Sequence, residues 1–153
     1  RGAVPVLGNV DHGLRSPMQQ GDAVAGGPFH QASCSVVPGP GEQAFLTVKG
    51  VTQGMSRAEF EYEIPLADAR ELLLMCEQPL IEKYRRKITY AGFVWEVDEF
   101  LGDNAGLVVA EIELDHADEA FERPDWLAGE VTDDPRYYNL ALASRPYRNW
   151  PRD

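Results

Sequence analysis

Residues 81–114 read IEKYRRKITYAGFVWEVDEFLGDNAGLVVAEIEL, and the segment contains three runs in which charged and apolar side chains alternate. The residues AG at 91–92 and GDNAG at 102–106 separate the runs, and residues of these types are typical of turns. Successive side chains of a strand point to opposite faces, so each run can bury one face and leave the other polar. The segment predicts strands at 81–90, 93–100 and 107–114, and their short connections favour an antiparallel meander.

The charged side chains of these runs fall on shared faces, and their sign differs from strand to strand. Lys83 and Arg85 share one face of their strand, Glu111 and Glu113 share one face of theirs, and the three glutamates of residues 59–64 (EFEYEI) do the same. If these faces meet across a sheet or barrel, they line a cavity with both carboxylates and cations. Such a lining suits a polyanion that travels with a divalent metal, since oxygen ligands bind the metal and Lys and Arg bind phosphates. A single run of alternating Glu would instead be typical of a solvated outer face.

The rest of the chain separates into two unlike parts. Residues 1–42 are rich in Gly and Pro with little periodicity, so loops, weak edge strands or disorder are expected there. The remainder, residues 43–153, is regular and is expected to form the functional domain. In it we predict further strands at 44–49 and 58–64, a helix over about 66–76 opened by Pro65, and short helices near 117–121 and 135–143.

Composition narrows the function classes. With 153 residues and a formal charge of -11, the chain fits one globular domain and lacks the net basic footprint of sequence-independent nucleic-acid binding. No apolar run approaches the roughly 20 residues of a membrane span, so no membrane partner is expected. Cys34 and Cys76 have no metal-binding spacing, so we interpret them as reduced thiols of a cytoplasmic protein, with a disulfide between them as the less favoured alternative.

Several short sequence motifs occur along the chain in an order that is typical of a known family. They are FLTVKG (45–50), RAEFEYEIP (57–65), KYR (83–85), WEVD (95–98), AEIEL (110–114), EVT (130–132), YYN (137–139) and LA (142–143). On these blocks the chain resembles the CYTH superfamily, also called the triphosphate tunnel metalloenzymes, over about two thirds of its length. The resemblance implies an α+β fold built on an antiparallel β-barrel of the triphosphate tunnel type, with flanking helices and a charged lumen.

The resemblance also implies roles for individual residues. Lys49, Lys83 and Arg85 would be the catalytic cations that hold phosphate oxygens. Substrate binding would further involve Arg57, a weaker candidate, and the acidic lining would include Glu61 and Glu63. The metal, Mg or Mn, would be carried by Glu111 and Glu113 with help from Asp98.

The amino-terminal part departs from the family. Residues 1–42 contain neither the Glu-x-Glu-x-Lys strand for which the family is known nor the Arg-x-Arg strand that precedes the Lys49 block, where CSVVPGP (34–40) stands instead. MQQG (18–21) is similar to a family segment, but Asp22 replaces its tyrosine. A reading-frame error upstream of Gly41 and a genuine, degenerate member are both open, and so is whether the barrel is complete or lacks strands.

The favoured function is metal-dependent hydrolysis of a triphosphate, with inorganic triphosphate as the first choice of small-molecule substrate. Thiamine triphosphate and nucleotides remain open as substrates. The alternative is a catalytically degenerate CYTH module that binds polyphosphate or a nucleotide, and a third possibility is a chain with no stable barrel. Exposed strand edges would allow a homo-oligomer.

Overall fold

The computed structural model describes residues 2–5, 18–24, 29–50, 58–116 and 118–151, and gives only the backbone of residues 2–5, 23–24 and 29–30. The chain divides into two compact units. The first contains Arg1–Leu14 and Lys83–Asp153, and the second contains Arg15–Glu82. Each unit combines an antiparallel sheet with at least one helix, which confirms the predicted α+β class.

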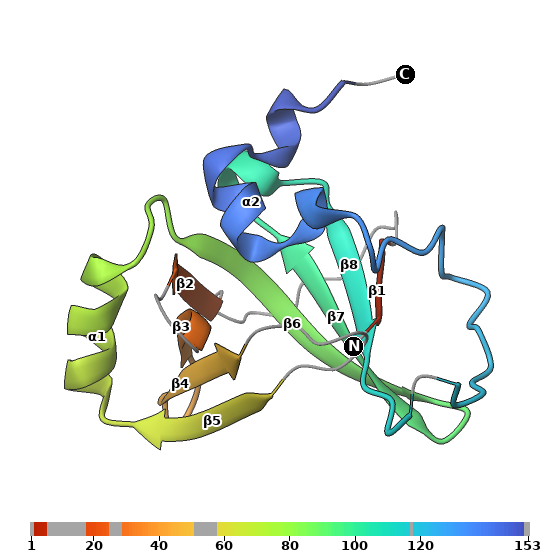
Figure 1. Ribbon diagram of the computed structural model, residues 1–153, viewed down its shortest axis with the longest axis horizontal. Helices are drawn as coiled ribbons and strands as arrows, with labels where there is room; N and C mark the ends of the chain where they lie inside the picture. Colours follow the sequence, from red (N-terminus) through yellow and green to blue (C-terminus); the bar gives the residue numbers. More distant parts are fainter. Residues whose placement is uncertain (1, 6–17, 25–28, 51–57, 117, 152–153) are drawn as a thin grey trace. The chain divides into compact units, whose positions relative to one another are not determined.

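The first unit contains four strands in the order β1-β8-β7-β6. They are β1 (Gly2–Pro5), β6 (Ile81–Tyr90, of which the last eight residues belong to this unit), β7 (Phe93–Phe100) and β8 (Val108–Ile112). Figure 1 shows β1, in red, beside β8. The 3₁₀ helices η1 (Gly102–Asn104), η2 (Pro135–Tyr137) and η3 (Tyr147–Asn149) and the helix α2 (Asn139–Ser144) complete the unit.

A two-residue turn sets the register of β6 and β7. Ala91 and Gly92 have φ angles of 47° and 84°. Positive φ at both central residues is the geometry of the type I′ hairpin turn, whose twist matches that of the flanking strands. The turn places Tyr90 opposite Phe93 and carries the pairing to Lys83 opposite Phe100.

One face of this sheet forms the core of the first unit. Its buried side chains are Trp95, Val97, Val108, Ala110 and Ile112. Phe121 and Trp126 pack edge-on against Trp95, each with a ring-centroid distance of 5.8 Å. The opposite face carries the charged side chains of alternate positions, while Arg86 and Glu99 share the face of the core. The residues of the opposite face are Lys83, Arg85, Lys87, Glu96, Asp98 and Glu111.

The second unit contains four strands in the order β2-β3-β4-β5, with one helix. They are β2 (Met18–Val24), β3 (Phe29–Val37), β4 (Gln43–Gly50) and β5 (Glu59–Ile64), followed by α1 (Leu66–Met75). The helix buries Ala69 and Leu73 against Cys34, Val36 and Ala44 of the sheet. Figure 1 shows α1 beside the strands of this unit.

A glycine permits the close approach at the end of α1. Gly21 lies opposite Cys34 in the β2–β3 pair. A Cβ atom at Gly21 would lie 2.6 Å from Cys76 Cβ and 2.8 Å from Leu80 Cδ2. Only glycine leaves room for these two side chains against the sheet.

The strands and the helix predicted between residues 43 and 114 are confirmed with small shifts of their ends, such as β8 ending at Ile112. The expectation of loops or weak edge strands in residues 18–24 and 29–37 is wrong, because β3 pairs with both β2 and β4. Its small side chains show little hydrophobic periodicity, and pairing with its two neighbours supplies the regular structure. The division at residue 42 stays a prediction.

The two short helices predicted near the carboxyl end need correction. Residues 118–121 form a turn and irregular structure, and Phe121 packs on Trp95 instead of continuing a helix. The helix predicted over 135–143 is divided into η2 and α2. Among the described helices, none has the length and apolar character to cross a bilayer.

Candidate functional site

Strand register brings the charged side chains of the first unit onto one face. Arg85 lies opposite Asp98, and Lys87 lies opposite Glu96. Glu96 lies in turn opposite Glu111 on β8. This face is the reverse of the one that carries Trp95 and the apolar core. The predicted sharing of one face by cations and carboxylates is thus confirmed within this unit.

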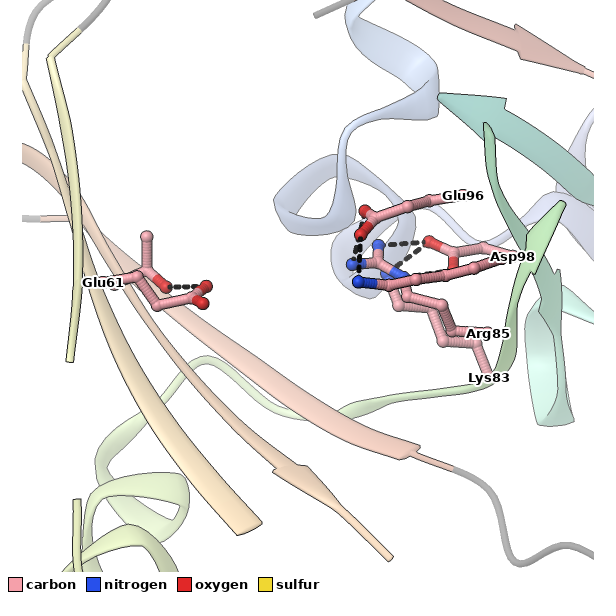
Figure 2. A network of polar contacts seen from close by, with 7 residues as sticks. Glu61, Lys83, Arg85, Glu96 and Asp98 are labelled. Carbon is pink, nitrogen blue, oxygen red and sulfur yellow. Dashed lines mark hydrogen bonds and ion pairs between the residues drawn. The ribbon is translucent and has the colours of Figure 1, made fainter. Parts of the chain in front are cut away.

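Asp98 is the centre of the charged face. Its Oδ2 atom accepts hydrogen bonds from Lys83 Nζ and from Arg85 Nη2, both at 2.7 Å, and its Oδ1 atom accepts one from Arg85 Nε at 2.7 Å. Figure 2 shows the three side chains converging. Asp98 is only 1% exposed and Lys83 only 2%. One buried carboxylate therefore orients both an ammonium and a guanidinium group.

The charges around Asp98 keep it ionised. Burial would raise the pKa of Asp98, but the charge of Lys83 and the hydrogen bond and charge of Arg85 outweigh burial and lower the pKa to about 2. Burial alone would lower the pKa of Arg85, whereas Asp98, Glu96 and Glu111 together raise it above its ordinary value. Lys83 also lies 5.5 Å from the centre of the Phe100 ring, a cation–π contact. Near neutral pH Asp98 and Arg85 are therefore both charged.

Glu96 completes the coordination of Arg85. Its Oε2 atom lies 2.9 Å from Arg85 Nη1, and its Oε1 atom lies 3.6 Å from Lys87 Nζ. Glu96 had no role predicted from its sequence context. The signal that could have found it is the two-residue spacing from Asp98, which places both carboxylates on the same face of β7.

The predicted metal ligands differ in their surroundings. Glu111 lies on the charged face opposite Glu96, while Glu113 follows the end of β8 and is exposed. Asp98 uses both oxygens on Lys83 and Arg85, so it has little capacity left for a cation. Within the described ranges, no group of three or more His, Cys, Asp or Glu side chains forms a ready metal site. The pair Glu96 and Glu111 still fits Mg²⁺, because this ion is usually held by one or two carboxylates together with water and substrate phosphates.

The remaining predicted residues lie in the second unit. Lys49 lies opposite Glu59 in the β4–β5 pair. Glu61 accepts a hydrogen bond from Thr47 Oγ1 at 3.2 Å, drawn in Figure 2, and Glu63 accepts one from Gln43 Nε2 at 3.5 Å. Arg57 lies outside the described residues. Since each unit stands by itself, the convergence of the two sets in one channel stays a prediction.

The second unit also contains buried polar side chains that had no predicted role in the site. On the face that carries Lys49, the buried polar residues are Gln20, Asp22, Ser33 and Thr47. Asp22 accepts a hydrogen bond from Gln31 Nε2 at 2.8 Å. Gln20, Asp22 and Ser33 lie on strands that were not predicted, so their alternation could not be used, whereas Thr47 lies on the predicted strand at 44–49.

Known proteins with similar sequences and structures identify the family. The CYTH domain matches residues 39–141. An inorganic triphosphatase of Acetivibrio thermocellus is 54% identical over 110 residues, which cover 71% of this chain and 70% of that protein. An inorganic triphosphatase of Nitrosomonas europaea is 36% identical over 107 residues, which cover 67% of this chain and 70% of that protein.

A solved structure agrees with these matches. The crystal structure of the inorganic triphosphatase NE1496 superimposes with a TM-score of 0.60 at 28% sequence identity, covering 93% of this chain and 94% of that chain. The likeness extends over far more of the chain than the matched sequence blocks and confirms the predicted barrel-type fold class. The chain belongs to the CYTH family.

Proposed function

We propose that this protein hydrolyses the terminal phosphoanhydride bond of inorganic triphosphate with the help of a divalent cation. The observation that carries the proposal is the buried Asp98, which holds Lys83 and Arg85 together on one charged face. The relatives named inorganic triphosphatase support the choice of substrate.

The cations act by electrostatic stabilisation. Hydrolysis spreads charge over the oxygens of the transferred phosphoryl group, and catalysis consists mainly of positioning and of offsetting that charge. Because Asp98 fixes Lys83 and Arg85 before substrate arrives, little reorganisation is needed during the reaction. Lys49 and Arg57 are proposed to hold further phosphate oxygens, and Glu61 and Glu63 to contribute acidic lining.

A divalent cation, Mg or Mn, would offset the charge of the phosphates and help to activate the attacking water. We assign its protein ligands to Glu111 and Glu96, and Glu113 stays a candidate at the end of the strand. Asp98, predicted as a third ligand, is better suited to positioning, since Lys83 and Arg85 engage both of its oxygens.

A second function is favoured by the described part of β1. Ala3 lies opposite Glu111 in the β1–β8 pair, and residues 2–5 read GAVP, without a carboxylate. A metal held by Glu111 would therefore gain no acidic ligand from β1. A module that binds polyphosphate or a nucleotide without hydrolysing it is the alternative.

Phosphate release from inorganic triphosphate tests the proposal. We expect release with Mg²⁺ or Mn²⁺, none with EDTA, and a loss of at least a hundredfold in Glu111→Ala. Glu71→Ala, an exposed change on α1, is the matched control and should be unaffected. Triphosphate binding by calorimetry without turnover in either metal would select the binding module.

A further inference from the structure

We propose that Glu96 is an internal competitor of the substrate, because it occupies the Arg85 group that a phosphate must contact and must release it when triphosphate binds. This inference rests on the proposed function and concerns the regulation of the same site. The Glu96 carboxylate imitates a phosphate oxygen, and its release couples phosphate binding to metal binding.

The guanidinium group of Arg85 has a carboxylate at each of its three nitrogens. Asp98 engages Nε and Nη2, and Glu96 engages Nη1 at 2.9 Å. A phosphate binds arginine best through two parallel N–H donors. Asp98 already holds one such pair, so a bidentate phosphate has to use the end of the group where Glu96 lies.

The charges of the face also give an anion no net attraction while Glu96 stays in place. The cations Lys83, Arg85 and Lys87 are matched by the carboxylates Glu96, Asp98 and Glu111, so the face has no net formal charge. Withdrawing Glu96 from Arg85 leaves a positive group facing the phosphate. The competition is therefore electrostatic as well as steric.

Of the two carboxylates, Glu96 is the one that can move. Asp98 is nearly inaccessible and has three contacts at 2.7 Å. The Glu96 side chain is 22% exposed, and its second contact, with Lys87, is 3.6 Å long and reaches an exposed ammonium. A partly solvated ion pair of this kind is held less strongly than a buried one.

Glu111 lies where the Glu96 carboxylate can turn after it leaves Arg85. Glu96 and Glu111 are direct cross-strand neighbours, and like charges in that position destabilise a sheet. A divalent cation placed between them reverses that effect. Glu96 would turn from Arg85 toward Glu111 when both carboxylates hold a divalent cation, which would free Arg85 for phosphate. By linkage, phosphate binding would favour cation binding to the same extent.

Calorimetry of triphosphate binding in EDTA tests the competition. Glu96→Gln keeps the shape of the side chain and removes its charge, so it should bind metal-free triphosphate about tenfold more tightly than the unchanged protein, the equivalent of about 1.4 kcal/mol. Glu71→Gln removes the same charge from the exposed face of α1 and should change the affinity less than twofold. Equal or weaker binding by Glu96→Gln overturns the proposal.

A second variant and a repeat of the titrations with Mg²⁺ test the proposal further. Glu96→Asp keeps the charge but shortens the reach to Arg85, so it should also tighten metal-free binding, by a smaller factor. With Mg²⁺ the advantage of Glu96→Gln should disappear, and an undiminished tenfold gain would contradict the coupling to metal. Failure of the proposed function looks different, because no variant, nor the unchanged protein, would then release phosphate with either metal.

Discussion

Replacing Asp98 by asparagine tests the physical basis of the site. The change removes the negative charge that Lys83 and Arg85 share. Lys83 is only 2% exposed, and it is then left without the counter-ion that Asp98 provides. Breaking a buried ion pair from one side costs about 3–5 kcal/mol, because the remaining charge is neither hydrated nor paired. We expect the free energy of unfolding to fall by about that amount at neutral pH.

The pH dependence gives an independent measure of the same interaction. The pKa of Asp98 is lowered from 3.8 to about 2 in the folded protein, which corresponds to about 2 kcal/mol. A lowered pKa stabilises the folded state above the ordinary value of the carboxyl group, and this stability is lost as pH falls toward about 2. The difference in stability between the unchanged protein and Asp98→Asn should therefore shrink between pH 5 and pH 2.

Urea unfolding followed by circular dichroism measures both effects. The control is Asp103→Asn, which breaks an ion pair of 2.6 Å with Arg148 between side chains that are 43% and 60% exposed. A surface pair contributes about 0–1 kcal/mol, so this variant should differ little from the unchanged protein. A loss below 1 kcal/mol in Asp98→Asn, or one equal to that of the control, would refute the assignment of Asp98 as the buried organiser.

Three further changes probe the fold and the site. Gly21→Ala should destabilise the second unit by about 1–3 kcal/mol in urea, because its Cβ would overlap Cys76 and Leu80, whereas Gly129→Ala has open space and should be neutral. Asn104→Ala loses the hydrogen bonds that it donates to Leu142 O at 3.3 Å and accepts from Tyr147 N at 2.8 Å, so amides of α2 and η3 should exchange faster by about tenfold while those of β3 do not. Arg85→Lys cannot bind Asp98 and Glu96 together, and triphosphate turnover should fall by at least tenfold with less than 2 kcal/mol lost in urea.

Local pattern explains why much of the first unit was predictable. The strands at 81–90 and 93–100 are marked by alternation and by the turn between them, and both signals lie within a few residues. Sharing of a face by Lys83 and Arg85 follows from the geometry of any strand. By contrast, β2 and β3 were missed because their small side chains show little contrast between the two faces, and pairing with neighbours is not visible in a local window.

The amino-acid sequence alone was sufficient for the family, the antiparallel class and the identity of the charged residues on each strand, because these depend on composition, order and a period of two. The partners of those residues required the folded chain. Asp98, which was predicted to help in metal binding, accepts hydrogen bonds from Lys83 and Arg85 in the folded chain. Glu96 had no predicted role; it contacts Arg85 and lies opposite Glu111. A shift of one residue in strand register moves every side chain to the other face, so which charges meet is set by long-range pairing that no single strand encodes.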